Sequence, residues 1–113
     1  TIERLNLYSN QIGHVGAKYI ADGLKENQTL THLYMGQNQI GNRGAKHMAE
    51  TLTVNQTLKY LSLSGTQIGD NGIQHLALAL RDNKTLDRVF LPKNISEDIR
   101  NNLVKQDHRL LFV

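Results

Sequence analysis

Apolar side chains return along this chain at an interval of 28 residues. One column of leucine and valine consists of Leu5, Leu33, Leu61 and Val89. Further columns with the same interval hold Leu30, Leu58 and Leu86; Ala21, Ala49 and Ala77; Gly16, Gly44 and Gly72; and Asn10, Asn38 and Asn94, with Thr66 in the third unit. A period of this length indicates stacked units, because a single unit cannot bury its apolar face alone.

Two hydrophobic periods alternate within each unit. Apolar residues stand at every second position in segments 33–35 and 61–63, which predicts short strands. In segment 45–52 they stand at i, i+3, i+4 and i+7, which predicts one buried face of a helix. Strands joined by helices at constant spacing must be parallel. The sequence therefore predicts an α/β right-handed solenoid of about four repeats, with a parallel sheet on the concave face and helices on the convex face.

The segment Ile-Gly-Asn-Arg-Gly, residues 40–44, has two possible explanations. Paired glycines before a helix can cradle a phosphate, but a phosphate loop also needs a lysine followed by serine or threonine. Here the helix continues as Gly-Ala-Lys-His, and the pattern recurs in other units. We therefore interpret the glycines as structural, serving sharp turns and close helix packing.

Asparagines recur in two places in each unit. Those after the strands, such as Asn38, are expected to bond backbone groups of the turn, and Thr66 is expected to replace only part of that bonding. Asn27, Asn55 and Asn83 are expected to close helices in the left-handed conformation. The same three residues begin Asn-x-Thr sequons, and Asn94 begins Asn-Ile-Ser, but we favour turn residues over glycosylation sites.

The motif Leu30-x-x-Leu33-x-Met35-x-x-Asn38, with copies at 58–66 and 86–94, resembles the leucine-rich repeat family. The 28-residue period resembles the ribonuclease-inhibitor-like subclass, and most of all the repeats of cytoplasmic NOD-like receptors. The resemblance implies a protein-recognition module in the cytoplasm.

The chain is expected to form one leucine-rich repeat domain over residues 1–113, with repeats at about 2–29, 30–57, 58–85 and 86–113. The last repeat lacks the glycines and is expected to be an atypical C-terminal cap, with Ser96 as helix N-cap and segment 109–113 as a last strand or apolar plug. Thr1 begins within the repeat pattern, so we expect the domain to be a segment of a longer protein.

Composition changes this picture little. The net charge of +3 comes from scattered basic residues, which makes nucleic acid an unlikely partner. There is no cysteine, so disulfides and thiolate metal sites are excluded. No apolar run is long enough for a membrane helix.

The residues between the buried strand positions are expected to face outward along the concave side. This face holds four of the six aromatic residues beside two arginines, and these residue types are favoured at protein interfaces. The expected partner-binding residues are Arg4, Asn6, Tyr8, His32, Tyr34, Tyr60, Ser62, Ser64, Arg88 and Phe90. Four strands span only about 15 Å, so tight binding is expected to need further surface.

Neither a catalytic nor a metal site is expected, and no cofactor. Ser62 and Ser64 have no acid and histidine placed to activate them. His47 and His75 share a column, but neighbouring helices lie too far apart for both to hold one metal ion. Binding of a protein partner is the leading hypothesis; the alternatives are regulation of an enzyme, such as a small GTPase or a ribonuclease, and binding of RNA.

Overall fold

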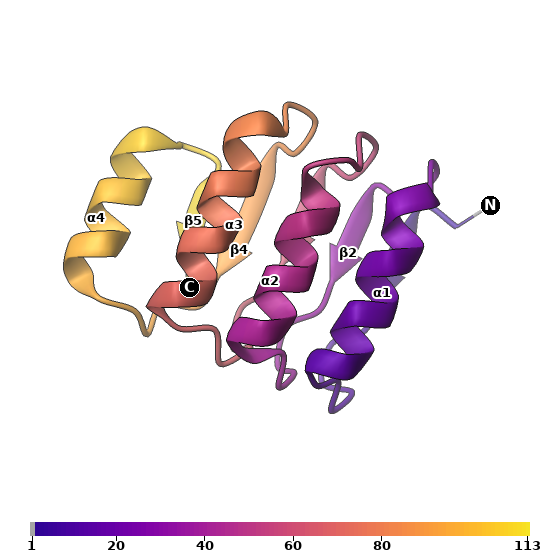
Figure 1. Cartoon of the computed structure of the whole chain (residues 1–113), viewed down its shortest axis with the longest axis horizontal. Helices are drawn as coiled ribbons and strands as arrows, with labels where there is room; N and C mark the ends of the chain where they lie inside the picture. Colours follow the sequence, from indigo (N-terminus) through magenta and orange to yellow (C-terminus); the bar gives the residue numbers. More distant parts are fainter. Residues whose placement is uncertain (1) are drawn as a thin grey trace.

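Each repeat folds as a short strand followed by a helix. The structure, a computed structural model, describes residues 2–113 (Figure 1). Its strands are β1 (Arg4–Asn6), β2 (His32–Tyr34), β3 (Tyr60–Ser62), β4 (Arg88–Leu91) and β5 (Leu110–Phe112). Its helices are α1 (His14–Glu26), α2 (Gly41–Leu52), α3 (Asp70–Asp82) and α4 (Glu97–Gln106).

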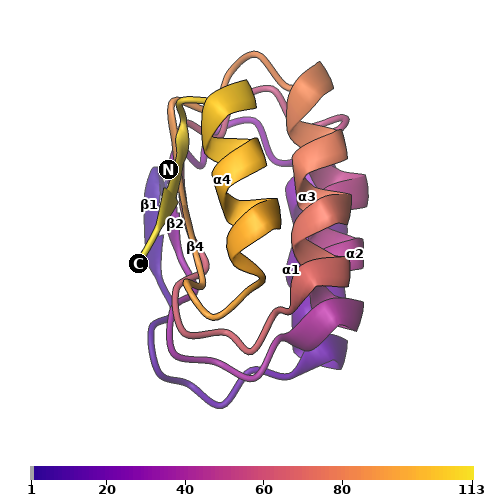
Figure 2. The ribbon, with the colours of Figure 1, turned by 90° about the vertical axis from the view of Figure 1, so that its left-hand side faces the viewer.

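The strands form one parallel sheet in chain order, as the sequence predicts. Residues 28 apart are paired from β1 to β4, for example Leu33 with Leu61. The helices cover one side of the sheet and leave the other side open, as Figure 2 shows. The structure therefore has two layers, with the apolar core between them.

The predicted apolar columns form this core. Leu33, Leu61 and Val89 are fully buried, as are Met35 and Leu63. In the first unit, Leu5 and Leu7 are only partly buried, because β1 is the edge strand of the sheet.

Gly44 and Gly72 leave room for the isoleucine four residues earlier and for the preceding helix. A Cβ atom on Gly72 would lie 2.7 Å from Asn42 Oδ1 and 3.0 Å from Ala45 Cβ, both on α2. A Cβ atom on Gly44 would likewise lie 3.2 Å from Ala17 Cβ on α1. The Asn42 carboxamide occupies the space beside Gly72, and its Oδ1 accepts hydrogen bonds from the backbone N–H groups of Gly69 and Gly72. The glycines thus have a structural role here, as predicted.

Asn38 connects two repeats through one buried side chain. Its Oδ1 accepts hydrogen bonds from the backbone N–H groups of Asn10 and Ile12, each at 2.9 Å. Its Nδ2 donates to the carbonyl oxygens of Leu7, Met35 and Gly36. Thr66, in the same column, donates only to the carbonyl oxygen of Leu63.

The expected left-handed conformation at the helix ends is wrong. Asn27 and Asn83 have extended backbones, with φ of −78° and −90°. These asparagines act through their side chains instead: Asn83 Nδ2 donates to the carbonyl oxygens of Leu52 and Asn55, and its Oδ1 accepts from two N–H groups of its own turn. Asn55 bonds in the same way, so both sequon amides are buried and engaged.

The last repeat ends the sheet with β5, so residues 110–112 form a strand rather than a plug. Arg109 takes the place of the asparagine: its guanidinium donates to the carbonyl oxygens of Leu80 and Asn83, each at 2.6 Å, and pairs with Asp107 at 2.8 Å. Ser96 occupies the N-cap position of α4, but no cap bond forms from its side chain. Its hydroxyl donates to the Asp70 carboxylate on α3 instead.

Candidate protein-binding face

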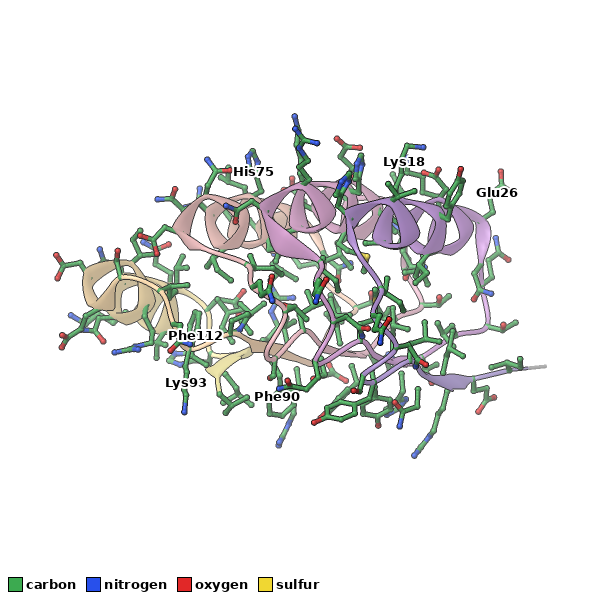
Figure 3. All side chains as sticks on the ribbon, turned by 90° about the horizontal axis from the view of Figure 1, so that it is seen from below. Lys18, Glu26, His75, Phe90, Lys93 and Phe112 are labelled. Atoms are coloured by element: carbon green, nitrogen blue, oxygen red, sulfur yellow. The ribbon has the colours of Figure 1, made fainter. Side chains whose placement is uncertain are left out.

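The side of the sheet that faces away from the helices carries the expected partner-binding side chains; we call it the open sheet face. Because side chains alternate along a strand, the residues flanking Leu33, Leu61 and Val89 lie on this face. Figure 3 shows Phe90 and Lys93 on the side of the molecule opposite Lys18 and His75. Arg4, Asn6, Tyr8 and Arg88 are exposed, and Ser62 is half-buried.

Four rings from three neighbouring strands form a continuous aromatic cluster: His32, Tyr34, Tyr60 and Phe90. The Tyr60 ring lies at the centre, with ring centroids 5.1 Å from Tyr34, 5.2 Å from Phe90 and 5.5 Å from His32. These distances are those of ring pairs that attract one another beyond simple burial. All four side chains remain partly exposed, so the cluster presents an ordered apolar surface to solvent.

Burial and a hydrogen-bonding neighbour act on two rings of this cluster. Burial raises the pKa of the Tyr60 phenol, with a further contribution from Tyr34. Thr31 Oγ1 lies 2.9 Å from His32 Nδ1, which orients the imidazole ring. The cluster can therefore offer both apolar ring surface and hydroxyl donors.

Ser64 differs from the expectation. Its Oγ is buried and has no hydrogen-bond partner within residues 2–113, so the hydroxyl is not part of the accessible face. β3 ends at Ser62, and the chain turns after it, with Gly65 at a φ of +66°. The strand alternation that orients Tyr60 and Ser62 therefore does not extend to Ser64.

A hollow of about 690 Å³ adjoins the open sheet face at the loop side. Tyr8 forms one wall, and Gln37, Lys93 and Val113 form others. Gln37, Lys93 and Val113 were not among the residues predicted from the sequence, because they lie outside the strand alternation. The chain packs closely beside this hollow: a Cβ at Gly36 would lie 3.2 Å from the Tyr8 ring, and one at Gly65 would overlap the Gln37 side chain.

The histidine and acidic side chains outside the open sheet face are dispersed over the surface. Over residues 2–113, no three histidine or acidic side chains gather as a metal site would require. His47 and His75 stand half-buried on α2 and α3, on the helical side. None of the described helices is long and apolar enough to cross a bilayer.

Comparison with known proteins agrees with this architecture. The family model described as "Leucine Rich repeat" matches residues 1–21, 26–49 and 54–77. A search of curated proteins finds no matching sequence. Among solved structures, the chain is similar to the one titled "Leiomodin-1 Actin-Binding Site 2 (ABS2)", with a TM-score of 0.83 and 21% identity over 96% of this chain and 67% of that one.

Leucine-rich repeat domains are generally protein-binding and typically not catalytic. Matched family segments cover more than half of the sequence, and the five parallel strands alternate with helices as such repeats require. The chain therefore belongs to the leucine-rich repeat family, with repeats of the ribonuclease-inhibitor-like type.

Proposed function

We propose that this domain is a protein-interaction module whose partner docks on the open sheet face. The observation that carries this proposal is the aromatic cluster, in which three partly exposed rings lie with their centroids 5.1–5.5 Å from that of the fourth, Tyr60. Rings that already pack against one another lose little side-chain entropy when a partner covers them, which is typical of interface anchors.

Arg4 and Arg88 extend the cluster at its rim. Both are exposed, as is Lys59 beside them, so this part of the face is basic apart from the flanking Glu3 and Asp87. A partner with an apolar centre and acidic rim residues would complement it. Charges at the rim would speed association more than they would tighten the complex.

Size supports a protein partner. The molecule measures 40 × 29 Å across the face on which the sheet lies. One side of an ordinary protein–protein interface covers about 800 Å². The strands alone are too small for this, so the footprint must include the loop-side hollow next to Tyr8.

RNA fits the open sheet face less well. Single-stranded bases bind by stacking on free ring faces. In the aromatic cluster His32 and Tyr60 already stack on each other at 17°, so one face of each of these two rings is occupied. A salt titration with a labelled RNA oligonucleotide separates the two functions, because nucleic-acid affinity falls steeply with salt.

The decisive experiment compares three forms of the domain as bait for cell-lysate proteins: the wild type, the double variant Tyr34→Ala/Tyr60→Ala, and Tyr19→Ala. Tyr19 is a matched control, since it is a tyrosine on α1 with 71% exposure. We expect partners that wild type and Tyr19→Ala retain and the double variant loses. Equal retention by all three forms would remove the open sheet face from the proposal.

The identity of such a partner would also decide the biological role. The resemblance to repeats of NOD-like receptors favours a sensing or autoinhibitory segment of a cytoplasmic protein, whereas capture of a small GTPase or ribonuclease would make the domain an enzyme regulator. Actin deserves a place among the partners tested, because the leiomodin-1 structure carries actin binding in its title. The shared fold by itself supports only the architecture.

A further inference from the structure

The last helix of the domain stands apart from the helical layer. α1 packs along α2, and α2 along α3, whereas α4 contacts β5 and its backbone hardly approaches α3. Figure 2 shows α4 displaced from α3 toward the sheet. None of the residues of α4 is fully buried, although α2 buries residues along its whole length. One side of α3 is therefore left without the neighbour that α1 and α2 have.

A groove follows this gap, and we call it the α3–α4 groove. Ala77 and Leu78 of α3 and Ile99 and Leu103 of α4 line its apolar part. A hollow of about 390 Å³ there continues into one of about 620 Å³, and Arg81 lines both. Leu78 is 56% exposed, so its side chain offers uncovered apolar surface.

The repeat pattern shows that Leu78 is an exception. The equivalent positions in the two preceding repeats hold Asp22 and Glu50, so the usual residue is a solvated acid. In α1 the acid of this column, Asp22, is exposed and accepts a hydrogen bond from Lys18 Nζ at 3.0 Å. A leucine thus replaces an acid at a position that lines the groove.

The groove becomes basic toward the C-terminal end of α3. Arg81 and Lys84 are exposed there, and Lys84 Nζ donates to the carbonyl oxygen of Arg81. Of the carboxylates that line the hollow, Asp107 is paired with Arg109, which leaves Asp87 as the unpaired acid. The free charge is therefore positive, and a partner with carboxylates would match it.

We propose that the α3–α4 groove binds an amphipathic helix of a partner protein, with the apolar stripe of that helix against Leu78 and Leu103 and its acidic residues toward Arg81 and Lys84. Helix-in-groove recognition uses such a stripe with anchors at i, i+3, i+4 and i+7. The apolar part of the groove lies between α3 and α4, away from the aromatic cluster, and only Asp87 at the far end of the adjoining hollow also flanks the open sheet face.

The test is a selection from a display library of helical peptides about four turns long, with a fixed leucine stripe and all other positions random. We expect recovered peptides to carry Asp or Glu beside the stripe. Fluorescence anisotropy should show at least a tenfold loss of affinity for Leu78→Glu, which restores the acid of the other repeats at an exposed site. Arg81→Glu should weaken binding, and peptides with Lys in place of the acids should then bind better than the originals.

Tyr34→Ala is the matched control, because it alters the opposite side of the molecule and should leave the affinity unchanged. Recovery of no binder, or of binders that Leu78→Glu does not weaken, would overturn the proposal. If Tyr34→Ala lowered the affinity for the peptides and Leu78→Glu did not, the peptides would bind on the open sheet face. That result would contradict the groove proposal but not the proposed function.

Discussion

Asn38 shows how much one buried side chain can contribute in a repeat fold. A turn leaves backbone N–H and C=O groups that strands and helices cannot pair, and a buried unpaired group costs free energy. One carboxamide carries both donors and acceptors, so Asn38 satisfies groups of its own repeat and of the preceding one. A threonine hydroxyl has a single donor, which explains why Thr66 bonds only within its own turn.

We expect Asn38→Ala to lower the free energy of unfolding by about 2–4 kcal/mol, because several backbone groups lose their partner at once. Thr66→Ala should cost only about 1 kcal/mol, since it removes one hydrogen bond. Urea titrations of the two variants provide the comparison. Similar losses for both would show that the asparagine contributes no more than the threonine.

At the scale of the elements, helix spacing depends on the second glycine of each pair. Gly72 lies where α3 approaches Asn42 and Ala45 of α2, whereas Gly23 in α1 has nothing within 4 Å of an added Cβ atom. Replacing glycine by alanine is therefore expected to change the stability of the domain in opposite directions at these two helical positions.

Gly72→Ala should destabilise the domain by about 1–3 kcal/mol, because the added Cβ atom would lie 2.5 Å from the Ile68 side chain and 2.7 Å from Asn42 Oδ1, so these side chains or the helices must move. Gly23→Ala should stabilise it by about 0.5–1 kcal/mol through helix propensity. Thermal or urea unfolding measures both. Stabilisation by Gly72→Ala would contradict the close packing of α2 and α3.

The C-terminal element depends on charge instead. The hydrogen bond from Arg109 holds the pKa of the Asp107 carboxyl below its ordinary value of about 3.9. The pair therefore stabilises the fold above that pH, and its contribution is lost as the pH falls from there toward the lowered pKa.

Asp107→Asn should lower the melting temperature at pH 7, and the difference from wild type should shrink as the pH falls below about 4. Melts followed by circular dichroism at several pH values measure this difference in melting temperature. Asp22 and Asp70 are present in both proteins, so their contributions cancel in the difference. A difference that stayed constant with pH would show that the Asp107 charge has no part in the cap.

For the whole molecule, the sequence predicted the parallel sheet, its 28-residue register and the core, because all three follow from columns that repeat. It also placed most of the open sheet face, since strand alternation decides orientation. Features that occur only once could not be predicted in this way: Arg109 bonds the carbonyl oxygens of Leu80 and Asn83 from a shortened repeat, and the α3–α4 groove exists because α4 lies nearer the sheet than α3 does. The buried Ser64 hydroxyl reflects a loop conformation that no period encodes.

The molecule therefore presents two different sides to solvent, and we propose that a protein partner contacts the open sheet face. Two exposed tyrosines mark these sides: Tyr8, 58% exposed beside the sheet, and Tyr19, 71% exposed on α1. A photoreactive p-benzoylphenylalanine at either position should leave the fold intact. The most direct measurement is which position crosslinks to the captured partner on illumination. We expect crosslinking from position 8 and little from position 19; crosslinking from position 19 alone would contradict binding on the open sheet face.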